Sequence, residues 1–122
     1  MDSNDNRVVI VDDVSDAAEA LASALEADGY SVKTATDGER ALALIEEFKP
    51  YCVLLDIDMP GLTGIEVASR LRAEHGSDLV LIAVTGWGTA DDRVSKALAD
   101  FDYYLRKPFD PAALRKVLHP LN

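Results

Sequence analysis

Short apolar runs alternate with longer segments of helical periodicity along the chain. β-branched and aliphatic residues dominate the short runs, which predicts strands, and apolar positions spaced three and four residues apart predict helices between them. The predicted strands are Val8–Val11, Tyr30–Ala35, Tyr51–Leu55, Leu79–Val84 and Asp102–Leu105. The chain is therefore expected to repeat a strand followed by a helix five times.

Capping and turn residues set the limits of the predicted helices. Gly29 follows the first helical segment in the position of a C-terminal cap, and Asp37 is placed to cap the second helix. Pro50 stops the second helix, and Thr63–Glu66 has the form of a capping box for the third. Pro111 is typical of the first position of a last helix. The fourth predicted helix carries apolar residues at Val94, Ala97, Leu98 and Phe101.

The character of the strands predicts the fold class. Val8–Val11, Val53–Leu55 and Leu79–Val84 are apolar on both faces, as central parallel strands covered by helices are. The runs at 30–35 and 102–105 alternate with polar residues, which suits the edges of a sheet. No linker, repeat or low-complexity tract interrupts the pattern. We therefore predict one doubly wound α/β domain over residues 1–122, with a five-stranded parallel sheet and about five helices.

Acidic residues outnumber basic ones by 22 to 12, which gives a net charge of −10. Nucleic acids and anionic membranes bind basic faces, so we expect this domain to bind neither by itself. Residues 1–28 hold eight carboxylates against the single basic residue Arg7. This bias is typical of a cation site, although solvated helix faces produce it as well.

The single cysteine indicates a reducing compartment. Cys52 lies in an apolar run, where a buried and inert thiol is expected, and one cysteine cannot form an internal disulfide. The acidic start of the chain lacks the features of a signal peptide, and the longest apolar stretch, Leu79–Val84, is too short to span a bilayer. We therefore expect a cytoplasmic domain.

Polar side chains gather at the carboxyl ends of the predicted strands, where ligands bind in an open parallel sheet. They are Asp12 and Asp13 after the first strand, Asp56 after the third, Thr85 after the fourth and Lys107 after the fifth. Each has a simpler explanation when it is taken alone. One of the first two acids could cap the first helix, Thr85 could be a strand former, and Lys107 could be a surface lysine. Chance alone is a poor explanation for the whole set at one edge of the sheet.

The chemistry of this set favours phosphoryl transfer. Carboxylates held close together invite Mg²⁺, and a hydroxyl and an ammonium group suit phosphate oxygens. Asp56, at the centre of the sheet, is a plausible nucleophile toward phosphorus that would form an aspartyl phosphate. No nucleophilic triad built on serine or cysteine competes with this interpretation. His75 and His119 fall at predicted helix ends, and we expect both to be solvated.

Four motifs resemble the receiver domain of two-component response regulators, in the order in which that chemotaxis-regulator-like superfamily has them. They are the acidic opening Val8–Asp13, the phospho-acceptor segment Leu54–Gly64, the switch-threonine segment Ala83–Gly86 and the lysine-proline segment Tyr104–Phe109. The resemblance covers about residues 7–121. It implies the flavodoxin-like receiver fold with strand order 2-1-3-4-5. It also implies a signalling phosphoprotein rather than an enzyme in the usual sense, one that catalyses its own phosphorylation and slow dephosphorylation.

The resemblance assigns roles around a magnesium ion. Asp56 would take a phosphoryl group from a phosphohistidine. Side chains of Asp13 and Asp56 would bind Mg²⁺, together with the backbone carbonyl of Asp58, and Asp12 would hold a bound water. Because Asp58 also adds an acid near the pocket, the segment has a second interpretation. Asp56-Ile57-Asp58 resembles the nucleophile and acid pair of haloacid dehalogenase-like phosphatases, although the double aspartate comes first here.

The resemblance also implies a switch and its partners. Thr85 and Lys107 would contact the phosphoryl oxygens, and Tyr104 would turn inward as the threonine moves. The partner would be a histidine kinase or a histidine phosphotransfer domain, and the chain would act as a stand-alone regulator, a relay or the receiver of a hybrid kinase. The output face, and a possible homodimer contact, would lie on the fourth helix, fifth strand and fifth helix. Its charged and aromatic residues would include Arg93, Lys96, Tyr103, Arg115 and Lys116.

One departure from the family pattern concerns the turn before the last strand. Residues 99–102 carry an acid where receivers often have glycine. We expect the turn from helix to strand to differ there.

Overall fold

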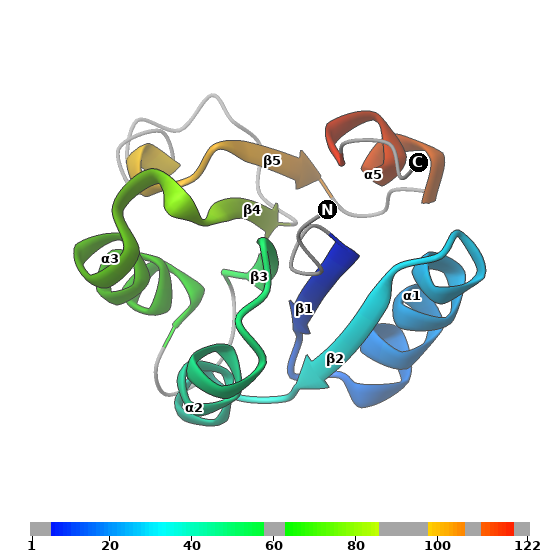
Figure 1. Ribbon diagram of the computed structural model, residues 1–122, viewed down its shortest axis with the longest axis horizontal. Helices are drawn as coiled ribbons and strands as arrows, with labels where there is room; N and C mark the ends of the chain where they lie inside the picture. Colours follow the sequence, from blue (N-terminus) through cyan, green and yellow to red (C-terminus); the bar gives the residue numbers. More distant parts are fainter. Residues whose placement is uncertain (1–5, 58–62, 86–97, 107–110, 119–122) are drawn as a thin grey trace.

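Five parallel strands form a sheet in the order β2-β1-β3-β4-β5 in the computed structural model, which describes residues 6–57, 63–85, 98–106 and 111–118 (Figure 1). The strands are β1 (Arg7–Val11), β2 (Ser31–Ala35), β3 (Cys52–Asp56), β4 (Val80–Thr85) and β5 (Tyr103–Arg106). The helices are α1 (Ser15–Ala27), α2 (Gly38–Phe48), α3 (Gly64–His75) and α5 (Pro111–Val117), with 3₁₀ turns η2 (Gly76–Asp78) and η3 (Leu98–Asp100). The predicted fold class, strand order and edge strands are confirmed. Residues 94–97 of the predicted fourth helix lie outside the described residues, and Leu98–Asp100 form the 3₁₀ turn η3.

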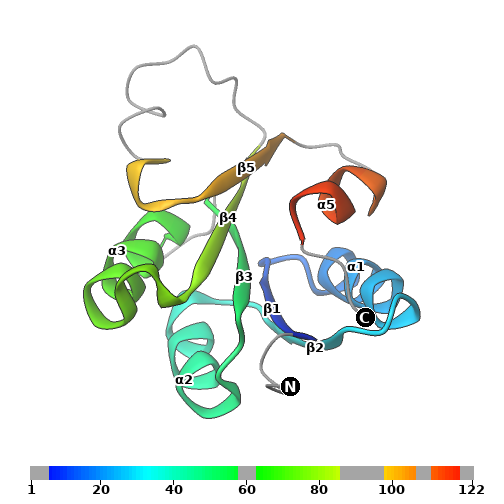
Figure 2. The same cartoon turned by 45° about the horizontal axis from the view of Figure 1, so that its top comes forward.

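Helices cover both faces of the sheet, as central apolar strands require. Helices α2 and α3 lie on one face, and α1 and α5 lie on the other (Figures 1 and 2). Alternate residues of each central strand enter different cores: Val9 and Val53 pack on the α2–α3 side, whereas Val8 and Cys52 pack on the α1–α5 side. Cys52 is buried as predicted, and burial raises the pKa of its thiol. None of the described helices is long and apolar enough to cross a membrane.

Local capping sets the limits of three helices where the sequence predicts: the end of α1 and the starts of α2 and α3. Gly29 has a φ of 100° and donates its N–H to the Glu26 carbonyl at 3.0 Å. The N–H of Tyr30 reaches the Leu25 carbonyl at 3.1 Å, which completes a Schellman motif. Asp37 accepts a bond from the N–H of Arg40 at 2.8 Å and caps α2. The capping box of Thr63 and Glu66 begins α3.

The expectation that His75 is solvated is wrong. Its side chain is 33% exposed, and its Nε2 atom is buried against two glutamates. The reason is tertiary: α3 packs beside α2, so the last turn of α3 faces a neighbouring helix. His119, which was given the same expectation, lies outside the described residues.

Arg72, in the last turn of α3, joins this helix to the start of β4 and to the turn before β5. Its Nη1 donates to the carbonyls of Gly76 and Leu79, at 2.7 and 2.9 Å. Its Nε and Nη2 donate to the carbonyl of Asp100, at 3.0 and 2.6 Å. One guanidinium therefore satisfies three carbonyl groups from two separate connecting segments.

The acidic turn before β5 supplies a partner for this arginine. Arg72 Nη2 pairs with Asp102 Oδ2 at 3.0 Å, and the same oxygen accepts a bond from the N–H of Leu81 at 2.9 Å. Asp102 thus links α3 to the sheet, while the expected difference of this turn from other receivers stays a prediction.

We expect Arg72→Met to lower the free energy of unfolding by about 2 kcal/mol, because it leaves several half-buried carbonyls without a donor. Asp102→Asn should cost less, because the ion pair is partly exposed and the amide oxygen can still accept from Leu81. Urea denaturation of the three proteins checks both values. Equal midpoints for wild type and Arg72→Met would show that these bonds add no net stability.

Candidate functional site

Three carboxylates meet at the carboxyl edge of the two central strands. Asp12 and Asp13 follow β1, and Asp56 is the last residue of β3. Parallel pairing of Val11 with Leu55 brings the two strand ends together, and carboxylate oxygens of the three acids lie within 4.8 Å of one another. Asp56 is 3% exposed, whereas Asp13 is exposed and Asp12 is half-buried. The predicted acidic cluster is confirmed for these three residues.

The possibility that Asp12 or Asp13 caps the first helix is wrong. The N-cap of α1 is Val14, which has no side-chain capping bond. Asp12 Oδ1 accepts the Val14 N–H at 2.9 Å and its own N–H donates to the Ala35 carbonyl at 3.1 Å, so the chain turns before the helix begins. This turn leaves both acids at the edge of the sheet, beside Asp56.

Thr85 ends β4, the strand beside β3, as Asp56 ends β3. It is fully buried. Asp56 pairs in register with Val84, so Thr85 is one residue beyond the level of Asp56. The N–H of Ile57 donates to the Val84 carbonyl at 3.1 Å, which holds the ends of the two strands together. The predicted strands end one residue too early here, since both polar residues belong to the ladder.

Gly64 is a site residue whose importance the sequence interpretation missed. A Cβ atom on this residue would overlap the Asp56 carbonyl oxygen and lie 2.8 Å from the Ile57 Cα atom. The first turn of α3 therefore packs directly on the backbone of Asp56, and only glycine allows that approach. The sequence contained a signal for this contact. Gly64 directly follows Thr63, the cap of α3, and glycine is a poor helix former.

The other predicted site residues divide into two groups. Tyr104 lies on β5 opposite Ala83, with 51% of its surface exposed. Its ring is thus on the surface in this structure. Lys107 and Asp58 lie outside the described residues, although β5 ends at Arg106, immediately before Lys107 in the sequence.

The electrostatics of the acidic edge favour a hard divalent cation. Like charges this close repel one another, and a buried carboxylate such as Asp56 has lost much of the water that would screen it. Carboxylate oxygens and water are the ligands that Mg²⁺ prefers, and Mg²⁺ commonly uses one or two carboxylates together with phosphate oxygens. The residues present therefore fit a magnesium and phosphoryl site.

Comparison with known proteins identifies the family. A model of the response regulator receiver domain matches residues 8–119, so the chain belongs to that family of two-component signalling proteins, whose members accept a phosphoryl group. Response regulator MprA of Mycolicibacterium vanbaalenii is 42% identical over 103 residues, covering 84% of this chain and 44% of that protein. Transcriptional regulatory protein PrrA of Mycobacterium tuberculosis is 41% identical over 108 residues, covering 88% and 46%. The chain thus spans less than half the length of these relatives.

Solved structures agree with this assignment. The response regulator TrrA of Thermotoga maritima, in complex with Mg²⁺ and BeF, has a TM-score of 0.81 and 32% identity, covering 91% of this chain and 94% of that one. A CheY-like receiver domain protein from Methanospirillum hungatei has a TM-score of 0.83 and 29% identity, covering 91% and 88%. The family match selects the receiver interpretation over the phosphatase alternative.

We expect Gly64→Ala to destabilise the domain by about 1–3 kcal/mol, because the new methyl group forces the backbones of α3 and β3 apart. Gly76→Ala is the matched control: it meets no atom within 4 Å, and its cost comes only from a φ of 58°. Urea denaturation gives both values. The close contact would be refuted if the two variants lost the same stability and Gly64→Ala kept a wild-type phosphorylation rate.

Proposed function

We propose that Asp56 is the phospho-acceptor of this receiver domain and that Mg²⁺ binds beside it. The observation that carries the proposal is the cluster of Asp12, Asp13 and Asp56 at the end of two buried strands, with Thr85 on the next strand. Side chains of Asp13 and Asp56 would bind the ion, with the carbonyl of Asp58, and Asp12 would hold one of its waters.

The transfer step needs a donor with a labile bond to phosphorus. A carboxylate oxygen of Asp56 attacks the phosphorus of a phosphohistidine, the P–N bond breaks, and the imidazole nitrogen leaves with its electron pair and takes up a proton. The product is an acyl phosphate on Asp56. Magnesium, when bound, neutralises charge on the phosphoryl oxygens. The protein itself contributes mainly positioning, and β3 supplies it by holding Asp56 in a rigid, buried strand.

The phosphoryl group would then bias the fold between two packings. The Thr85 hydroxyl and the Lys107 ammonium would bond to its oxygens, which draws β4 and β5 toward the new charge. The exposed position of Tyr104 supports this proposal, because an aromatic ring at the surface of β5 can turn inward when Thr85 moves. The surface that changes would be the fourth helix, β5 and α5, which would also be the contact of any homodimer.

The partners follow from the donor chemistry. We infer a histidine kinase or a histidine phosphotransfer domain as donor, and a downstream protein or covalently linked domain as receiver of the signal. With a net charge of −10, the domain itself is not suited to bind nucleic acid. The Mg²⁺ and BeF complex of TrrA supports the proposed magnesium ion.

Acetyl phosphate tests the proposal without the cognate kinase. In the presence of Mg²⁺, we expect the intact mass of the wild-type protein to rise by one phosphoryl group and Asp56→Asn to show no adduct. Asp13→Asn should react roughly tenfold or more slowly, because it loses a metal ligand. Chelation of Mg²⁺ should abolish the adduct in every variant.

Asp16→Asn is the matched control for these substitutions. Asp16 is an exposed acid in the first turn of α1, close in sequence to Asp13 but outside the carboxylate cluster. It should be phosphorylated at the wild-type rate. An adduct of equal yield in Asp56→Asn would refute Asp56 as acceptor, and wild-type kinetics in Asp13→Asn would refute its role as a magnesium ligand.

A further inference from the structure

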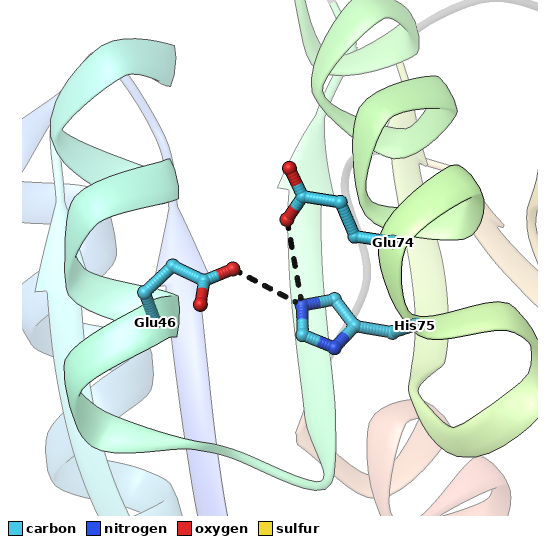
Figure 3. A group of neighbouring side chains, drawn as sticks. All are labelled: Glu46, Glu74 and His75. Carbon is cyan, nitrogen blue, oxygen red and sulfur yellow. Dashed lines mark ion pairs between the residues drawn. The ribbon is translucent and has the colours of Figure 1, made fainter.

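A second group of potential metal ligands lies between α2 and α3. Glu46 belongs to the last turn of α2, and Glu74 and His75 end α3. Nε2 of His75 lies 3.4 Å from Glu46 Oε1 and 3.9 Å from Glu74 Oε2, and one ligand atom of each residue lies within 4.8 Å of the other two. Figure 3 shows Glu46 reaching from α2 toward the imidazole of His75, which comes from α3 together with Glu74.

The histidine nitrogen is the unusual member of this group. Nε2 of His75 is shielded from solvent and has no hydrogen-bond partner within the part of the chain that the structure describes. A buried nitrogen without a hydrogen-bond partner costs free energy, and the nearest polar atoms to this one are two carboxylate oxygens. A metal ion between the three atoms would satisfy the nitrogen and both oxygens.

The two glutamates of the group are not paired with a base. Lys49, which caps α2, and Arg70 line the hollows beside the group, but among the described residues neither Glu46 nor Glu74 forms an ion pair with a lysine or arginine. Helix carboxyl ends carry partial negative charge, so both glutamates occupy the less favourable end of their helices. The two unpaired carboxylates therefore favour a cation between them.

The group is also accessible to an ion and its waters. It borders a surface hollow of about 320 Å³ beside α2 and η2, whose lining includes Asp78 and Lys49. The lining of a second hollow includes Glu46, Glu74 and Arg70. Solvent can thus occupy the coordination positions that the three side chains leave open.

We propose that Glu46, Glu74 and His75 form a binding site for a divalent transition-metal ion of the zinc type. An imidazole nitrogen with carboxylates suits Zn²⁺ rather than Mg²⁺, which prefers oxygen ligands alone. With bonds of about 2.1 Å, neighbouring ligands of tetrahedral zinc lie about 3.4 Å apart. Nε2 of His75 and Oε1 of Glu46 already have that separation. A small rotation of the exposed Glu74 side chain would bring its Oε2 atom from 3.9 Å to the same distance from Nε2.

This site is separate from the proposed phosphorylation site. Both glutamate-bearing helix ends lead into the amino ends of β3 and β4, whereas Asp56 ends β3 at the opposite edge of the sheet. The five residues of β3 span about 15 Å between these two edges of the sheet. The bound ion would join α2 to α3 and stabilise the folded state, whatever the phosphorylation state of the domain.

Zinc titration of the untagged, metal-free protein tests the proposal. Calorimetry is performed in excess Mg²⁺ and repeated with Asp13→Asn, so that the acidic edge near Asp56 does not contribute. We expect one Zn²⁺ per chain and an unfolding temperature several degrees higher with zinc. His75→Gln should abolish the effect, and Glu46→Gln should weaken binding roughly tenfold or more.

Two variants serve as controls, and a spectrum identifies the ligand atom. His119→Gln removes the other histidine of the chain, and Glu39→Gln removes an exposed glutamate of α2 outside the group; both should bind zinc as the wild type does. In long-range ¹H–¹⁵N spectra, zinc should shift the Nε2 resonance of His75. Zinc binding that survives in a folded His75→Gln or Glu46→Gln protein, or the absence of binding at micromolar zinc, would overturn the proposal.

Discussion

The repulsion among Asp12, Asp13 and Asp56 is the constraint on which the functional edge of this domain depends. Hydrogen-bonded pairing of β1 with β3 holds the three carboxylates together, and the apolar cores on both faces of the sheet prevent the strands from separating. The free energy of hydrophobic burial thus maintains an arrangement of charges that would disperse in a flexible loop. Such an edge binds cations and phosphoryl groups because the fold has already brought the charges together.

The sequence was sufficient for this edge of the sheet because its signals are local. Each polar residue directly follows or ends an apolar run, and parallel strands bring their carboxyl ends to one edge of the sheet. The alternation of strands and helices along the chain was therefore enough to predict that Asp56 and Thr85 lie near each other. Helix limits were equally local: Gly29 and Asp37 act through bonds to residues within a few positions. The observed ends of β3 and β4 lie one residue beyond the predicted ends. A polar residue marks the end of an apolar run, but the hydrogen-bonded ladder continues through it.

Contacts distant in sequence were beyond such reasoning. Nothing in the sequence around Arg72 distinguishes it from an ordinary surface arginine. Its bonds to Asp100 and Asp102 form only because the fold places the start of β5 beside α3. His75 was expected to be solvated because helix ends usually are, yet Glu46, almost thirty residues earlier, meets it across two helices. Neither partner could be deduced from periodicity, which gives the face of a helix but not the helix that packs against it.

Helix α3 connects these observations. Its first residue, Gly64, lies on the backbone of Asp56, and its last turn is attached through Arg72 to the segments that lead into β4 and β5. The same helix packs beside α2. An element held at both ends resists displacement when charge is added to Asp56. By contrast, β5 is an edge strand of the sheet and exposes Tyr103 and Tyr104. We therefore expect a charge-driven rearrangement to move Thr85 and β5 rather than α3, because an edge strand pairs with a neighbour on one side only.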